Sequence, residues 1–156
     1  MADELFLTEE GKAEIEARLR FLKNEKRPEV LDKLKVARDF GDLSENSEYD
    51  AAKKEQSIVE TEIANIEETL RKARIISDKD VKKDTVGVGN SVTVYDMDFD
   101  EEVVYKIVGV IESDPDKNFV SNASPIGKAL MDKKVGEIVT VTTPGGDIQM
   151  KILKIS

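Results

Sequence analysis

The hydrophobic residues in the first half of the chain follow the repeat of a helix. Between Glu45 and Ala73, one set of positions steps alternately by three and four residues, so all of its members lie on one helix face. The set consists of Tyr49, Ala52, Gln56, Val59, Ile63, Ile66, Leu70 and Ala73. Only Gln56 is polar, and an unbroken heptad pattern of this kind is typical of a coiled coil.

A second set of apolar positions with the same spacing lies upstream. It consists of Ile15, Leu19, Leu22, Val30, Leu34 and Ala37, with Lys26 in step between the two groups. Thr8 is the expected N-cap of this helix. Pro28 lies inside the helix and has no backbone N–H, so we expect a kink or a local break near residues 24–27.

The two predicted helices need each other, because neither can bury its apolar stripe alone. A short segment that contains Gly41 joins them, and helices with so short a connection pack antiparallel. We therefore expect a long hairpin with its tip near residues 41–47. An arm of ~30 residues would extend about 45 Å.

In the second half of the chain, alternating apolar and polar residues replace the helical repeat. Strands are predicted at residues 86–95, 102–111, 137–142 and 147–155. The last two are joined by a strong turn signal at residues 143–146, Thr-Pro-Gly-Gly. A short helix is predicted up to Met131, with Ser124 as its N-cap and Pro125 at the first helical position.

These patterns predict an α+β protein with two domains. Residues 1–78 are expected to form the long antiparallel coiled-coil hairpin. Residues 79–156 are expected to form a small antiparallel sheet wrapped on one helix.

The composition excludes several classes of protein. The chain contains no Cys, no His and no Trp. Disulfides, Cys-ligated zinc and catalytic groups built on Cys or His are therefore excluded. A bound metal would need oxygen ligands, which suits Mg²⁺, Mn²⁺ or Ca²⁺.

The net charge and the hydropathy of the chain exclude further classes of protein. With 24 Lys and Arg against 33 Asp and Glu, the net charge is −9, which argues against a protein that grips nucleic acid by its phosphates. No apolar run is long enough to span a membrane, and the first residues lack the features of a signal peptide. We expect a cytoplasmic protein without a membrane partner.

Acidic residues are concentrated at the predicted tip. Five of them occur without a basic residue in between, namely Asp39, Asp42, Glu45, Glu48 and Asp50. Spacing alone favours a structural role, a capping box with Asp42 as the N-cap of the second helix and Glu45 as its third residue. The alternative is half of a metal site: two or three carboxylates supply only part of the six oxygens that a hard cation needs, and another macromolecule would supply the rest.

Basic residues flank these acids, among them Arg38 on one side and Lys53 on the other. Such residues usually form a solvated helix face with ion pairs between successive turns. A second interpretation is that they steer an RNA end towards the acids.

The tip also carries a motif that resembles a family signature. Residues 37–49, Ala-Arg-Asp-Phe-Gly-Asp-Leu-Ser-Glu-Asn-Ser-Glu-Tyr, are similar to the signature of the bacterial Gre transcript cleavage factors, specifically of the GreA type. Three further segments resemble the same family in the same order, namely Arg27-Pro28-Glu29, Ser124-Pro125-Ile126 and Thr143-Pro144-Gly145-Gly146. The resemblance covers essentially the whole chain. Asp42 and Glu45 match the usual pattern. The departures from it are Asp39, Phe40, Ser47, Asp50 and Lys53.

The resemblance implies a coiled-coil hairpin followed by a C-terminal domain of FKBP-like fold. It also implies a monomeric transcription elongation factor that is not itself an enzyme. The C-terminal domain would dock on bacterial RNA polymerase, and the hairpin would enter the secondary channel towards the 3′ end of backtracked RNA. There Asp42 and Glu45 would help to hold a Mg²⁺ ion shared with the polymerase active site and position the water that cleaves the RNA.

The same resemblance assigns supporting roles to other residues. The acid pair would be supported by its neighbours Gly41, Leu43, Ser44, Asn46, Glu48 and Tyr49. Arg38 and Lys53 would steer the RNA. Ser124 and Pro125 would contact the polymerase, although a helix start accounts for the same two residues.

Three alternatives are kept open. The first is a Gre relative that occupies the channel and regulates the polymerase without cleavage, but such relatives alter the tip acids, and the pair here is intact. The second is a prolyl isomerase, which would need an aromatic-lined pocket; the aromatic residues of the second half are Tyr95, Phe99, Tyr105 and Phe119. The third is a coiled-coil chaperone or adaptor, whose activity would not depend on the tip acids.

Overall fold

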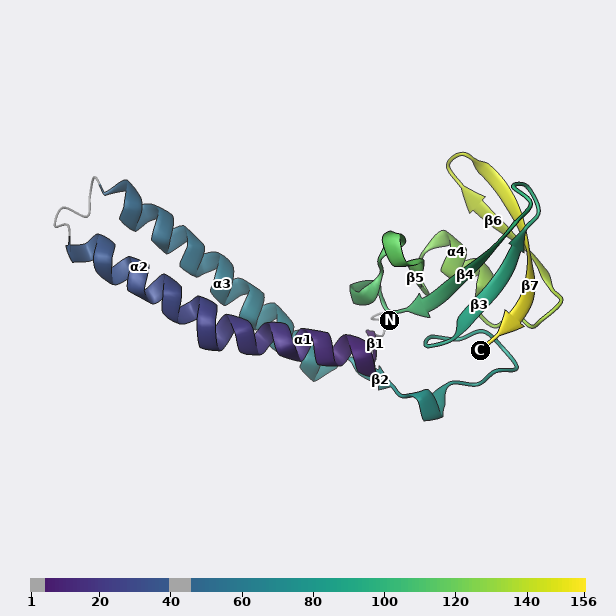
Figure 1. Ribbon diagram of the computed structural model, residues 1–156, viewed down its shortest axis with the longest axis horizontal. Helices are drawn as coiled ribbons and strands as arrows, with labels where there is room; N and C mark the ends of the chain where they lie inside the picture. Colours follow the sequence, from purple (N-terminus) through teal and green to yellow (C-terminus); the bar gives the residue numbers. More distant parts are fainter. Residues whose placement is uncertain (1–4, 40–45) are drawn as a thin grey trace. The chain divides into compact units, whose positions relative to one another are not determined.

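The computed structural model describes residues 5–39 and 46–156 (Figure 1). The chain forms two compact units. The helical hairpin comprises Lys12–Lys72, and the sheet unit comprises Ala73–Ser156 together with the segment up to Gly11. Among the described residues, no helix is both long enough and apolar enough to cross a membrane.

The helical hairpin is built from two long antiparallel runs of helix (Figure 1). The first run consists of α1 (Glu9–Phe21), a π-helical turn (Leu22–Lys26) and α2 (Arg27–Asp39). The second is a single helix, α3 (Ser47–Lys72). Phe21 and Arg27, which flank the π-helical turn, both have helical backbone angles, so the first run continues through it.

The π-helical turn is the irregularity that was predicted just before Pro28. Proline has no N–H to donate and its ring crowds the carbonyl four residues earlier, so an ordinary α-helical turn cannot close there. In the structure the Arg27 N–H donates instead to the Leu22 carbonyl, five residues back. The irregularity lies where the sequence predicts it and takes the form of one widened turn.

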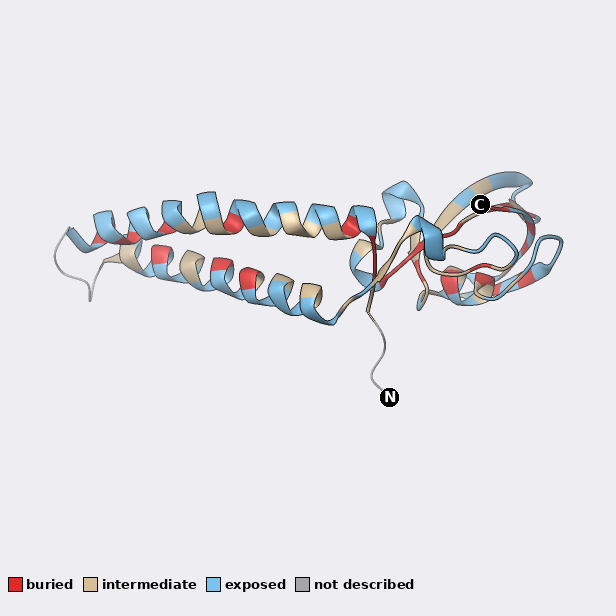
Figure 2. Ribbon diagram, turned by 90° about the horizontal axis from the view of Figure 1, so that it is seen from below, coloured by how far each residue is buried: buried red, intermediate tan, exposed pale blue. Residues whose placement is uncertain are grey.

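An apolar seam holds the two runs of the hairpin together. Its buried residues are Leu22, Val30, Leu34, Ala52, Val59 and Ile63, with Leu19, Tyr49 and Ile66 packed against them. Figure 2 shows these buried positions on the facing sides of the helices. The heptad pattern predicted from the sequence is therefore confirmed.

Ion pairs flank this seam and link the two runs. Arg18 pairs with Glu62 and Arg27 pairs with Glu60, each at 2.8 Å, and Lys26 pairs with Glu55 at 3.0 Å. Hydrogen bonds from lysine side chains, Lys26 first, lower the pKa of Glu55. These pairs are at least partly exposed to solvent, so they favour the observed register more than they add to stability.

The sheet unit contains a five-stranded sheet in the order β5-β4-β3-β7-β6. Its strands are β3 (Ser91–Asp96), β4 (Glu101–Val108), β5 (Phe119–Ser121), β6 (Ile138–Thr143) and β7 (Gly146–Ile155). All neighbours are antiparallel except β4 and β5. One helix, α4 (Pro125–Leu130), packs on the sheet with Leu130 in its core. The α+β fold expected from the sequence is therefore confirmed.

Two of the predicted strands were too long. The strand expected at residues 86–95 begins at Ser91, because Asn90 organises the preceding residues into a turn. The Asn90 side chain is only 2% exposed; its oxygen accepts from the Gly87 N–H, and its amide nitrogen donates to the carbonyls of Lys82 and Ser156. The strand expected at residues 102–111 ends at Val108.

Directly after β4, Gly109 allows a close approach to the backbone of the N-terminal segment. A Cβ atom there would lie 1.9 Å from the carbonyl oxygen of Phe6. Phe6 belongs to β1 (Phe6–Thr8), which pairs in parallel with β2 (Arg74–Ile76). This two-stranded sheet was not predicted, because three-residue strands carry too little pattern to recognise.

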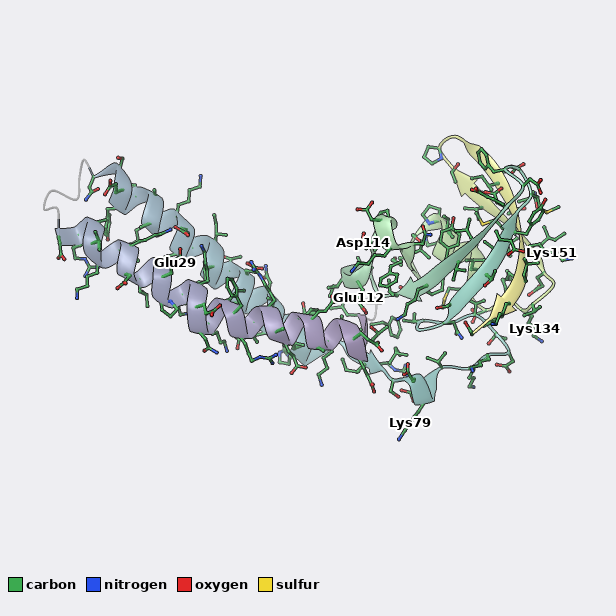
Figure 3. All side chains as sticks on the ribbon, in the orientation of Figure 1. Glu29, Lys79, Glu112, Asp114, Lys134 and Lys151 are labelled. Carbon is green, nitrogen blue, oxygen red and sulfur yellow. The ribbon has the colours of Figure 1, made fainter. Side chains whose placement is uncertain are left out.

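The expected N-cap at Thr8 is confirmed and has a further partner. The Thr8 hydroxyl accepts from the Gly11 N–H at 3.1 Å. The carboxylate of Glu112, labelled in Figure 3, accepts from the Thr8 N–H at 2.8 Å and from the Thr8 hydroxyl. Glu112 therefore fixes the N-terminal segment within the sheet unit.

Ser124 is the N-cap of α4, as the sequence predicts. Its hydroxyl accepts from the Gly127 N–H at 3.1 Å and donates to the Ser121 carbonyl at 2.7 Å, and Pro125 follows in the first turn. A Cβ atom at Gly127 would lie 1.8 Å from the same Ser121 carbonyl oxygen. Close packing of α4 on β5 therefore requires glycine at this position.

We predict that Gly127→Ala destabilises the sheet unit by about 1–3 kcal/mol, because the added methyl group forces α4 away from β5. Gly145→Ala is the matched control, since the nearest atom to its new Cβ would be 3.9 Å away. Urea unfolding gives the free energy, and hydrogen exchange assigns the loss to the sheet unit. Equal stability of the two variants would show that the contact at Gly127 relaxes without cost.

Candidate functional site

The candidate site is the segment that joins α2 to α3. α2 ends at Asp39 and α3 begins at Ser47. The predicted site residues Gly41, Asp42, Leu43, Ser44 and Glu45 lie outside the described residues. The structure describes the two helix ends that flank them, together with Arg38, Asn46, Glu48, Tyr49 and Lys53.

Asn46 links the two helix ends. Its side-chain oxygen accepts from the Tyr49 N–H at 3.1 Å, which makes it the N-cap of α3. Its side-chain nitrogen donates to the Ala37 carbonyl at 2.6 Å, near the C-terminal end of α2. One side chain therefore satisfies an unpaired amide of one helix and a terminal carbonyl of the other.

The capping-box interpretation of Asp42 and Glu45 is wrong for the second helix. That interpretation required α3 to begin just after Asp42, with Glu45 in its first turn. Instead α3 begins at Ser47, and the N–H that a cap must satisfy is bonded to Asn46. The start of α3 therefore does not require the two acids, which leaves the metal-site interpretation as the alternative.

The other described tip residues divide into a packed one and several exposed ones. Tyr49 is partly buried against the hairpin seam, and the Lys53 ammonium group lies 5.9 Å from the centre of its ring. Arg38, Glu48 and Lys53 are exposed. Tyr49 therefore supports the start of α3, while the charged residues are available to a partner.

No cluster of three or more acidic side chains that could hold a metal occurs within residues 5–39 and 46–156. Glu48 and Asp50 are exposed in the first turn of α3 without such a cluster. The described residues thus do not form a closed cation site. Ser124 and Pro125, the predicted docking residues, belong to the sheet unit and start α4.

A groove of about 420 Å³ lies beside these two residues in the sheet unit. Small and polar side chains line it, namely Ala123, Pro125, Lys128, Ala129, Thr140 and Thr142. It contains no aromatic side chain, so it lacks the apolar, aromatic wall that a prolyl isomerase needs.

Both halves of the chain match models of one family. Residues 5–75 match the model described as "Transcription elongation factor, N-terminal", and residues 81–156 match "Transcription elongation factor, GreA/GreB, C-term". The GreA protein of Thermoanaerobacter pseudethanolicus is 52% identical over 155 residues, which cover 99% of each chain. The chain belongs to the GreA/GreB family of transcription elongation factors.

Other relatives of this elongation factor give the same assignment. GreA of Bacillus licheniformis is 50% identical over 150 residues, which cover 96% of this chain and 95% of the relative. Among solved structures, GreA factor homolog 1 of Thermus thermophilus is 27% identical and covers 99% of both chains with a TM-score of 0.45. The GreA/GreB factor of Nitrosomonas europaea is 16% identical, with a TM-score of 0.43 over 98% of this chain and 99% of the other. The assignment rests on the sequence matches.

We predict that Asn46→Ala destabilises the first turn of α3 by about 1 kcal/mol, the usual cost of losing an N-cap. Asn46→Asp keeps the capping oxygen and loses the donor to Ala37, so it separates the two bonds. Hydrogen exchange of the Tyr49 amide, which donates to the Asn46 side chain, and of the neighbouring Asp50 amide should speed up strongly in the alanine variant and weakly in the aspartate variant. Unchanged exchange in Asn46→Ala would contradict the assigned cap.

Proposed function

We propose that this elongation factor stimulates RNA polymerase to cleave its own backtracked transcript, with Asp42 and Glu45 as the residues that act at the reacting phosphate. The observation that supports this most directly is Asn46. Because it caps α3, the acid pair between the helices has no role in starting that helix. Five uncompensated acids in so short a segment repel one another, which a purely structural role does not explain.

The helical hairpin suits a narrow channel. α3 alone has 26 residues, which corresponds to about 39 Å of helix. Its partner run is helical from Glu9 to Asp39, and the ion pairs link the two runs at several levels. Such an arm can carry a short segment into a site that a globular domain cannot enter.

The carboxylates would complete a site that the polymerase begins. Mg²⁺ prefers six oxygen ligands in an octahedral arrangement, and two carboxylates supply only part of them. When bound in a two-metal site, the second Mg²⁺ stabilises the attacking oxygen of a phosphoryl transfer. Asp42 and Glu45 would hold this ion jointly with the polymerase, and a remaining carboxylate oxygen would orient the attacking water by accepting its hydrogen.

The polymerase is then the catalyst and the factor completes its site. Cleavage would release a short 3′ fragment and leave a new RNA 3′ end at the active centre, so that synthesis resumes. The sheet unit would dock on the polymerase outside the channel. The Ser124–Pro125 segment is our proposed contact there, although Ser124 also has a structural role as the cap of α4.

We predict that Asp42→Asn and Glu45→Gln each reduce factor-stimulated RNA cleavage by at least about 100-fold, the usual scale for loss of an electrostatic catalytic group. The measurement is release of the labelled 3′ fragment from a stalled, backtracked bacterial elongation complex. Binding of both variants to the polymerase should match the unaltered protein, because the changes remove charge and little volume.

Glu14→Gln is the control, since Glu14 is an exposed acid of α1 without an ion pair to any described residue. It should cleave at the normal rate. If the unaltered protein binds the polymerase but releases no fragment, the factor belongs with relatives that occupy the channel without cleavage. If Asp42→Asn cleaves normally, the acid pair has no catalytic role.

A further inference from the structure

A groove runs along one face of the helical hairpin between α2 and α3, close to their ends at Asp39 and Ser47. Its volume is about 560 Å³. The floor is apolar and consists of Val36, Ala37, Ala51 and Ala52. The rim is charged and consists of Glu29, Asp32, Lys33, Glu48 and Glu55. We call these nine residues the acid-rimmed groove; Glu29 is labelled in Figure 3.

The floor of the acid-rimmed groove presents apolar surface to solvent. Ala37 and Ala52 are buried in the hairpin seam and form its bottom. Val36 is 56% exposed, although it is a large apolar residue, and Ala51 is exposed beside it. Because three of the four floor residues are alanines, the side chains leave the groove open for a partner to fill.

The rim is acidic after its internal ion pairs are counted. The four carboxylates face Lys33 on the rim and the neighbouring Lys26, which pairs with Glu29 at 3.7 Å and with Glu55 at 3.0 Å, so the net charge is 2 − 4 = −2. Lys33 pairs with Glu29 at 3.5 Å and with Glu55 at 3.2 Å. Asp32 and Glu48 form no ion pair with any residue in the described part of the chain. They are the two rim charges that a partner can use.

We infer that the acid-rimmed groove receives an arginine-bearing segment of the polymerase, which deepens the proposed function and rests on it. A long cationic side chain has an apolar stem and a charged head. Its stem fits the surface of Val36 and Ala51, and its head fits the unpaired carboxylates of Asp32 and Glu48. Arginine suits this arrangement better than lysine, because its guanidinium group binds carboxylates with two hydrogen bonds and gives up water more easily.

Charge argues against the other occupants of this face. RNA phosphates would meet two excess negative charges on the rim, those of Asp32 and Glu48. A second copy of the chain, with a net charge of −9, would be repelled as a whole. The face of the hairpin that carries the groove therefore contacts protein. This contact holds the hairpin in the channel independently of the catalytic acids.

The test is the double variant Asp32→Lys/Glu48→Lys in the full chain. We expect the concentration needed for half-maximal binding to bacterial RNA polymerase to rise about tenfold or more, as when like charges are opposed in an interface. At saturating factor, the single variant Asp32→Lys, which leaves Glu48 in place, should cleave the transcript at the rate of the unaltered protein. Fluorescence anisotropy of the labelled factor gives the binding curve, and circular dichroism confirms that the helices are intact.

Two further variants make the result specific. Asp32→Asn/Glu48→Gln removes the charges with little change in shape, and should weaken binding in the same direction by a smaller factor. Glu14→Lys makes a charge reversal elsewhere on the hairpin, at an exposed acid outside the groove, and should leave binding unchanged. An equal loss in Glu14→Lys would mean that general electrostatics, not the groove, controls binding.

The remaining outcomes separate this inference from the proposed function. If the unaltered protein binds and stimulates cleavage while both groove variants bind as tightly, the groove inference is overturned and the function stands. If the unaltered protein binds without stimulating cleavage, the binding curves still test the groove. Cross-linking of a groove residue to RNA, or a dimer in sedimentation that the groove variants abolish, would each replace the polymerase segment by another occupant and contradict the inference.

Discussion

The contact between α2 and α3 is the interaction on which the candidate site depends. Most of the stability of a helix in a protein comes from the packing of its apolar face, so each run needs the apolar seam of the other. Burying one aliphatic side chain there contributes roughly 1.5–3 kcal/mol, whereas the exposed ion pairs contribute much less. The seam ends near Ala37 and Tyr49, where Asn46 bonds to both helices. Packing and one asparagine together fix the helix ends between which the acid pair lies.

In the proposed function, the residue that caps α3 is different from the residues that act at the reacting phosphate. Asn46 is neutral, and it satisfies the amide and the carbonyl that the helix ends leave open. An aspartate in the same place would supply the capping oxygen but not the donor. Because the cap is neutral and lies outside the acid pair, the carboxylates of Asp42 and Glu45 can be kept for a cation and a partner. A similar division occurs along the acid-rimmed groove. Glu29 and Glu55 are paired with lysines, whereas Asp32 and Glu48 have no ion pair within the described residues.

The repeat of apolar residues along the chain made most of the fold predictable. The errors come from single side chains that bond to the backbone and from strands too short to show a pattern. The heptad positions identified the hairpin, and Pro28 located the irregular turn, because both act through helix geometry. The strand that begins at Ser91 was predicted to begin five residues too early. The alternation of apolar and polar residues does not show that the Asn90 side chain holds the preceding backbone in a turn. The two short strands near Leu7 and Ile75 lie before and after the hairpin in the sequence, so no local pattern marks their pairing. From the sequence, Asn46 was named only as a neighbour of the acid pair. Its place three residues before Tyr49, the first heptad position, was the signal for the cap, and the Asp42–Glu45 spacing obscured it.

In the proposed function the factor contributes ligands to a metal ion shared with the polymerase, so it should change the Mg²⁺ dependence of cleavage. The rate of fragment release from a backtracked elongation complex would be measured across a Mg²⁺ titration with no factor, with the unaltered factor and with Asp42→Asn at saturation. If the metal site is shared, the unaltered factor lowers the Mg²⁺ concentration for half-maximal cleavage, and Asp42→Asn returns this concentration towards the value without factor. The same half-maximal concentration in all three, with the factor bound, would contradict a shared metal site.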